Sequence, residues 1–127
     1  MKHRAQFLTI SLGVLSVLLL ILSASIFWNY ASLKIRLKFA DEQTLIFEKM
    51  RRQAVSADPP GAVDCLSYIA NYYPSGSKQV TGSILDSLVE RERNHAISDI
   101  IASLRVKTRQ DLGDSPAPWI QKYGKGK

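Results

Sequence analysis

Hydrophobic side chains dominate the start of the chain, where no charged residue lies between Arg4 and Lys34. The stretch from Phe7 to Trp28 contains fourteen Leu, Ile, Val or Phe residues. It exceeds the roughly 20 residues that an α-helix needs to span a bilayer. At about −0.3 to −0.6 kcal/mol each, these side chains favour insertion by roughly 4 to 8 kcal/mol. The pattern predicts a transmembrane anchor over residues 1–31.

A cleaved signal peptide is the alternative interpretation of this segment. Lys2 and Arg4 supply a basic start, and Ser23-Ala24-Ser25 offers small residues for cleavage. However, the apolar stretch is longer than the usual core of about 7–15 residues, and it continues past that site. Trp28 and Tyr30 also stand where interfacial aromatic side chains occur. We therefore predict an uncleaved, single-pass anchor.

A helical pattern of apolar residues continues after the anchor. At about 100° per residue, one side of a helix would carry an apolar stripe that includes one glutamine. Its members are Ile35, Phe39, Gln43, Ile46, Phe47, Met50 and Ala54. The spacing predicts an amphipathic juxtamembrane helix over residues 32–57, continuous with the anchor. The sequence Pro59-Pro60-Gly61 ends it.

The remaining residues, 58–127, are predicted to form one small helical domain. A helical pattern runs from Pro60 to Tyr73, with apolar residues at Val63, Leu66, Ile69, Ala70 and Tyr73. A polar loop follows over residues 75–82. The expected fold is all-α, with one N-terminal transmembrane helix followed by a small helical hairpin or bundle.

The longest helical pattern of this domain begins at Ser83. Asp86 stands three residues further on, which is the spacing of a capping box. The helix is expected to reach Thr108, and its apolar stripe is Leu85, Val89, Ala96, Ile97, Ile100 and Leu104. Arg93 projects into that stripe, where its stem can cover the core and either Glu90 or a carboxylate from another helix can pair with its guanidinium.

A short helix is predicted near the end of the sequence. Asp114-Ser115 is its expected cap, and Pro116 suits the first turn. Trp119 and Tyr123 lie one turn apart on it, and we expect both rings to pack back on the domain. A basic tail follows.

The basic residues that give the net charge of +6 lie on both sides of the apolar segment. Residues 1–30 contribute +2, residues 31–57 +3, residues 58–82 −1 and residues 83–127 +2. Nucleic-acid-binding proteins usually gather basic residues on one face, so a membrane surface explains this distribution better. The predicted membrane-surface residues are Lys34, Arg36 and Lys38, and the same basic stretch includes Lys49, Arg51 and Arg52.

The orientation of the anchor follows from the distribution of Lys and Arg within about 15–20 residues of its ends. The N-terminal side has two such residues and the amine, whereas the C-terminal side has six. This count favours an inner (cytoplasmic) membrane with the C-terminal domain in the cytoplasm. Long domains translocate largely regardless of charge, and the short charged tail of residues 1–4 resists crossing, so the opposite orientation stays open.

Glu92, His95 and Asp99 form the one constellation near a metal-binding pattern. Glu-x-x-His is half of a di-iron ligand pair, and bundle sites need a second such motif. The only other histidine, His3, precedes the anchor, so a solvated helix face is the favoured interpretation. Cys65 is the only cysteine, which excludes an intrachain disulfide or a Cys-x-x-Cys site. It is expected to be a small buried apolar residue.

No phosphate-binding loop, nucleophile elbow or dinucleotide fingerprint occurs in the sequence. We therefore expect a non-catalytic protein without a cofactor. The leading hypothesis is a membrane-tethered interaction or accessory module that binds a protein partner or a second copy of itself. The alternatives are a module that binds anionic lipid through the juxtamembrane basic residues, and a metal-binding enzyme.

Three stretches of the sequence carry a resemblance. They are Phe39-Ala40-Asp41-Glu42-Gln43, Asn71-Tyr72-Tyr73-Pro74-Ser75-Gly76, and Asp111-Leu112-Gly113 followed by Trp119-Ile120-Gln121-Lys122-Tyr123. They resemble uncharacterised short single-span bacterial membrane proteins of the planctomycete type, over roughly Phe39 to Tyr123. No activity is known for such proteins, so the resemblance implies a bacterial membrane and no functional residue.

Overall fold

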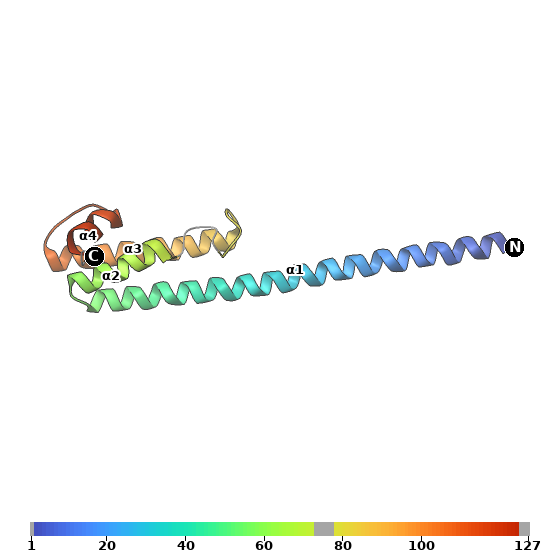
Figure 1. Ribbon diagram of the computed structural model, residues 1–127, viewed down its shortest axis with the longest axis horizontal. Coiled ribbons are helices and arrows are strands. Elements are labelled where there is room, and N and C mark those ends of the chain that lie inside the picture. Colours follow the sequence, from blue (N-terminus) through green and yellow to red (C-terminus); the bar gives the residue numbers. More distant parts are fainter. Residues whose placement is uncertain (1, 73–77, 125–127) are drawn as a thin grey trace. The chain divides into compact units, whose positions relative to one another are not determined.

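The computed structural model describes residues 2–72 and 78–124, which contain four α-helices and no strand. The helices are α1 (Lys2–Ser56), α2 (Pro59–Tyr72), α3 (Ile84–Thr108) and α4 (Pro116–Tyr123) (Figure 1). The predicted all-α class is therefore confirmed. The chain divides into two compact units, Met1–Ile35 and Arg36–Lys127, and α1 contributes residues to both.

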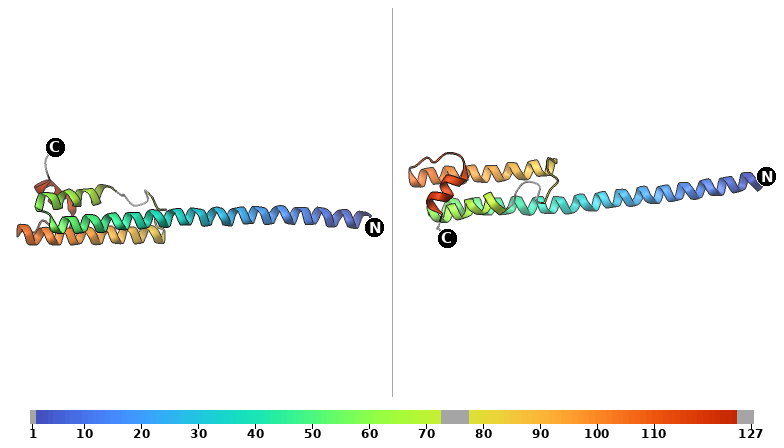
Figure 2. Two further views of the ribbon diagram at one scale, coloured as in Figure 1. Left: turned by 90° about the horizontal axis from the view of Figure 1, so that it is seen from below. Right: turned by 45° about the horizontal axis from the view of Figure 1, so that its top comes forward.

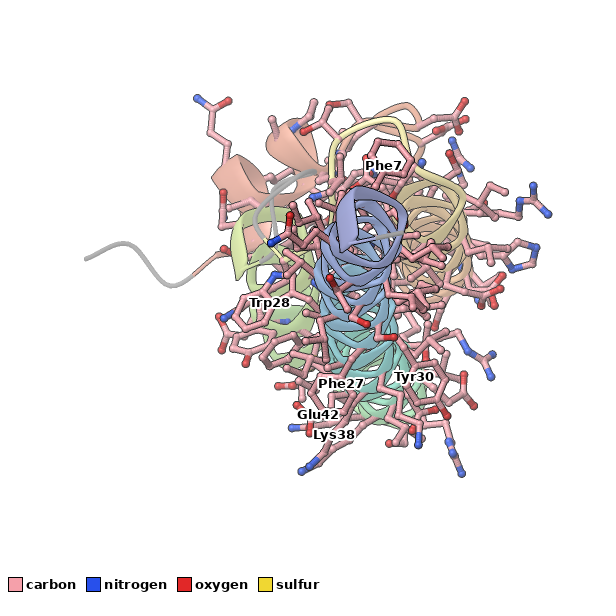
Figure 3. All side chains as sticks on the ribbon, turned by 90° about the vertical axis from the view of Figure 1, so that its right-hand side faces the viewer. Phe7, Phe27, Trp28, Tyr30, Lys38 and Glu42 are labelled. Atoms are coloured by element: carbon pink, nitrogen blue, oxygen red, sulfur yellow. The ribbon has the colours of Figure 1, made fainter. Side chains whose placement is uncertain are left out.

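The first unit is an apolar stretch of α1. Its large apolar side chains from Phe7 onward are each at least 50% exposed. Viewed along the helix in Figure 3, Phe7, Phe27, Trp28 and Tyr30 point to different sides. A helix that is hydrophobic all round belongs in a large protein core or in a membrane. Within the described residues, α1 is the one helix long and apolar enough to cross a membrane.

Three hydroxyl groups in this unit form hydrogen bonds within the helix. Those of Thr9, Ser11 and Ser16 each donate to a backbone carbonyl three or four residues earlier at 2.9 Å. A lipid environment offers no water to these groups. Their internal hydrogen bonds are therefore compatible with insertion.

The second unit packs the end of α1 together with α2, α3 and α4. In this unit α3 runs in the same direction as α1 and α2 runs in the opposite direction (Figure 2). The short α4 packs against both α2 and α3. Side chains from all four helices meet in the core, and the largest fully buried ones include Phe47, Leu66, Ile100, Leu104 and Trp119. Burying each such side chain contributes roughly 1.5–3 kcal/mol.

The amphipathic pattern predicted after the anchor is confirmed in its second half. Gln43, Phe47 and Ala54 are all buried in the domain. Ile35 and Phe39 share the predicted apolar stripe but are 56% and 37% exposed. Periodicity identifies a shared helix face, whereas burial also requires a neighbouring element to cover it.

The boundary between the units also differs from the expected one. The sequence suggests a juxtamembrane segment over residues 32–57, continuous with the anchor helix, and a domain over residues 58–127. Instead, the chain from Arg36 onward belongs to one unit. The reason is that Phe47 and Ala54 contribute to the domain core, so this part of α1 is an integral helix of the bundle.

Helix ends follow the predicted positions closely, and local hydrogen bonds explain them. The amide of Gly61 donates to Asp58 Oδ1 at 3.1 Å at the start of α2, and the predicted end at Tyr73 lies outside the described residues. At the start of α3, the amide of Asp86 donates to Ser83 Oγ at 3.2 Å, while Asp86 Oδ2 accepts from the amide of Gly82 at 2.9 Å. The hydrogen bond to Ser83 confirms the predicted N-cap, whereas Asp86 closes a variant of the capping box on the amide of Gly82, one residue before the N-cap.

The start of α4 is held differently from the predicted cap. Ser115 occupies the N-cap position, but its side chain makes no capping hydrogen bond. Asp114 Oδ1 instead accepts from Arg105 Nη2 at 2.7 Å, and Arg105 Nε donates to Asp111 Oδ1 at 2.8 Å. One guanidinium at the end of α3 thereby fixes both sides of the connection to α4.

Trp119 and Tyr123 pack back on the domain, as predicted. Trp119 is fully buried, and its Nε1 donates to the carbonyl of Gly113 at 2.9 Å. Gly113 has a φ of +88°, a conformation that glycine adopts without strain. Tyr123 is packed against the core, and its hydroxyl donates to Gln110 Oε1 at 2.8 Å. The aromatic pair thus closes the bundle over α2 and α3.

Candidate functional site

The three predicted membrane-surface residues are all exposed. Within the first unit, the ammonium of Lys34 lies 4.8 Å from the centroid of the Tyr30 ring, a cation–π arrangement. Within the second unit, Arg36 and Lys38 are exposed on α1. Figure 3 shows Lys38, together with Glu42, projecting from α1 away from α2 and α3. These cations are therefore accessible to an anionic surface.

Two other basic residues of the juxtamembrane stretch are engaged by an acid on the same helix. Arg51 contacts Glu48 through two hydrogen bonds of 2.8 Å, and Arg52 Nε lies 3.0 Å from Glu48 Oε1. The hydrogen bond from Arg51 is the main cause that lowers the pKa of Glu48. Lys49 is exposed. Arg51 and Arg52 are thus less suited than Lys34, Arg36 and Lys38 to bind lipid headgroups.

Arg51 also connects two helices of the domain. Its Nη1 donates to Asp99 Oδ2 on α3 at 3.2 Å, although the two residues are 48 positions apart in the sequence. The pair borders an open hollow of about 300 Å³ between α1 and α3, which Glu48, Glu92 and His95 also line. The hollow is polar on both sides, so it can present charged groups to a partner.

The three metal-ligand candidates border this same hollow but do not form a metal site. Glu92 and His95 are exposed, and Asp99 is half-buried and accepts the hydrogen bond from Arg51. Within the part of the chain that the structure describes, no three His, Cys, Asp or Glu side chains gather closely enough to hold a metal ion. The arrangement corresponds to a solvated face with one interhelical ion pair.

A second open hollow of about 420 Å³ lies on another part of α3 and includes Arg93, Ser98 and Arg105 in its lining. The predicted partner of Arg93 is confirmed, because Arg93 Nε lies 3.4 Å from Glu90 Oε2. The side chain of Arg93 is only 19% exposed, as expected for a stem that covers the core. Both hollows are surface features between helices.

A third surface lies beside Arg36 and was not foreseen from the sequence pattern. Gln79 is 95% buried, and its Nε2 donates to the backbone carbonyl of Arg36 at 3.0 Å. The ammonium of Lys78 lies 5.3 Å from the centroid of the Phe39 ring. We call the exposed residues at these contacts, together with those that follow in the turn and along α3, the proximal surface. They are Arg36, Phe39, Lys78, Val80, Ile84 and Leu88.

Cys65 is buried in the core, with 5% of its surface exposed. Burial, followed by the charge of the neighbouring Asp64, raises the pKa of its thiol. The thiolate is the reactive form of cysteine, so the folded domain disfavours reaction at this position. The predicted buried apolar role is confirmed.

Comparison with protein-family models, with curated proteins and with solved structures finds no significant match to this chain. The resemblance to short planctomycete membrane proteins therefore stays a prediction. The geometry of the site itself is the basis for the functional proposal.

Proposed function

We propose that this chain is a membrane-tethered interaction module. The supporting observation is that α1 serves two environments. Its exposed apolar segment from Phe7 to Trp28 suits a single membrane span, and further along the same helix Phe47 and Ala54 belong to the core of the domain. The open hollows of this small bundle carry polar groups, which can form the rim of a contact with another protein or a second copy of the chain.

We also propose a cytoplasmic C-terminal domain at an inner membrane, since Lys and Arg are concentrated on that side of the span. Cys65 is a poor reporter of orientation because it is buried. Val106 is 80% exposed near the end of α3 and is a better position. A Val106→Cys, Cys65→Ala variant should resist an impermeant thiol reagent in intact spheroplasts and react after lysis. Labelling in intact spheroplasts would instead place the C-terminal domain on the outer side of the membrane.

The tether and the partner can be tested together. Full-length tagged protein, purified from its own host in mild detergent, should bring down a stoichiometric protein partner or behave as a discrete oligomer. A chain that lacks residues 1–31 should leave the membrane fraction. A monomer without any partner would contradict the interaction role, and membrane attachment without the anchor would contradict a simple tether.

Matched substitutions on α3 can identify the contact face. Glu92→Ala with His95→Ala alters the hollow beside α1, whereas Arg91→Ala with Asn94→Ala alters exposed neighbours of the same helix. If only the first pair of substitutions abolished partner binding, the contact face would be the α1–α3 hollow. If only the second pair did so, the contact face would be another face of α3.

A further inference from the structure

We infer that the proximal surface is a second contact with the membrane, in which Val80 and Ile84 enter the boundary between headgroups and acyl chains. This inference rests on the proposed tether. It concerns residues 78–88, which lie far from the anchor in the sequence. The occupant is the lipid surface itself.

Three large apolar side chains of the proximal surface are exposed within a short stretch of the chain. Val80 is 51% exposed, Ile84 81% and Leu88 45%, and Ile84 and Leu88 lie one turn apart on α3. Large apolar side chains that are exposed together and flanked by polar groups mark interaction surfaces. The basic side chains of Arg36 and Lys78 flank this group, as anionic headgroups require.

Hydrogen bonds fix the backbone that carries these side chains. The turn from Val80 to Ser83 is closed by a 2.9 Å hydrogen bond between the Ser83 amide and the Val80 carbonyl. The capping box holds the adjoining first turn of α3. The buried amide of Gln79 then attaches the turn to the backbone of Arg36. The exposed apolar side chains are thus presented by a fixed turn next to Arg36.

Arg36 of the proximal surface is also continuous in the chain with the apolar segment. Arg36 follows Ile35, the last residue of the first unit, directly in the chain. The uncharged run of residues 5–33 has 29 residues, which make a helix of about 43 Å. A bilayer core is only about 30 Å thick. The excess of about 13 Å allows the span to shift until Arg36 lies in the headgroup layer. Apolar side chains beside Arg36 would then reach lipid.

The structure provides a matched pair of positions for a test. Ile84 and Val106 stand at opposite ends of α3 and are 81% and 80% exposed. Each is replaced by cysteine in full-length protein that carries Cys65→Ala, and a third variant carries Ser16→Cys in the apolar segment. The three variants are labelled with an environment-sensitive fluorophore and reconstituted in nanodiscs that contain lipids with nitroxide-labelled acyl chains.

We expect quenching and a blue-shifted emission at position 84, and neither at position 106, while the label at position 16 is quenched by deep nitroxides. If the label at position 16 were quenched but the labels at positions 84 and 106 showed the same quenching and emission as each other, this inference would be overturned and the tether would stand. Absence of quenching at all three positions would overturn both.

A second copy of the chain is the competing occupant. In that case the emission at position 84 would be blue-shifted without quenching by lipid, and the shift would disappear when the protein is diluted in excess lipid. That result would also overturn the lipid contact. Each variant is first checked for an unchanged denaturation profile, so that an unfolded domain is not mistaken for a membrane contact.

Discussion

The ammonium of Lys107 on α3 lies 2.8 Å from the backbone carbonyl of Val55 in the last turn of α1. The same group donates to the carbonyls of Ala54 and Ala57. The final carbonyls of a helix have no partner within the helix, and a cation there also complements the helix dipole. Lys107 thus caps a helix to which it is not adjacent in the sequence.

Replacing Lys107 with methionine should destabilise the domain by about 1–2 kcal/mol, because several charge-assisted hydrogen bonds are lost at once. The thiol of Cys65 offers a specific probe of domain unfolding, because it is the only cysteine and is buried. Its reactivity against denaturant concentration, measured in detergent micelles, reports the free energy of unfolding without interference from the anchor.

Lys49→Met is the matched control for that experiment. Lys49 is an exposed lysine on α1 in the same domain. Its replacement should change the free energy of unfolding by less than about 0.5 kcal/mol. Equal effects of the two variants would show that the interhelical cap contributes nothing specific.

Arg109→Gly should stabilise the domain by about 1 kcal/mol. Arg109 follows α3 with a φ of +54° and a ψ of +31°, a left-handed conformation that costs non-glycine residues energy. Glycine adopts it freely and is the preferred residue at this position after a helix. In the glycine variant, the Cys65 thiol should become reactive only at a higher denaturant concentration. A shift to lower concentration would indicate that the arginine side chain has a stabilising contact.

The connection between α3 and α4 should weaken in acid. A hydrogen bond from the amide of Gly113, followed by one from Arg105, lowers the pKa of Asp111 in the folded state. A lowered folded pKa means that the stabilisation is complete above the unfolded pKa and is lost as the pH falls through the folded pKa. Trp119 fluorescence, in a Trp28→Phe background, should show declining stability below about pH 4.

Asp111→Asn should reduce that acid-dependent loss, because the amide does not titrate. Glu42→Gln removes an exposed carboxylate from a different element, α1, and controls for the change in net charge. If the asparagine variant kept the full pH dependence, the titration would have to arise from another carboxylate. Glu48, whose pKa is also lowered, would be the next residue to replace.

Trp119→Phe should destabilise the domain by about 2 kcal/mol. The smaller ring leaves part of a fully buried site unfilled, and the carbonyl of Gly113 loses its indole donor. Cys65 reactivity again provides the measurement. Trp28→Phe, in the exposed apolar segment, should leave the reactivity unchanged and so serves as the control.

The sequence predicts the helices of this protein well, because their causes are local. The capping box at Ser83 and Asp86 and the burial of Val89, Ala96, Ile100 and Leu104 follow from spacing along one segment. The contacts between Arg51 and Asp99, Lys107 and Val55, and Gln79 and Arg36 depend on how helices are placed against each other. No local pattern encodes that register.

The same distinction applies to Ile35 and Phe39. They belong to the same predicted apolar stripe as Phe47 and Ala54, but only the latter two are buried. α2 has 14 residues and α3 has 25, so the two helices do not cover α1 over equal lengths. The proximal surface arises in the second unit beside Arg36, where apolar residues of α1 and α3 remain exposed.

The shared use of α1 also sets an order of events during biosynthesis. The apolar segment is translated before the domain and could enter the membrane while the domain is still being made. Phe47 then emerges before the rest of the core, since Trp119 closes the core from α4, which is translated after α1, α2 and α3. The nascent domain would wait with an unburied aromatic ring, a state in which chaperones commonly protect such chains. Insertion would precede folding, and slow translation beyond α1 would prolong that exposure.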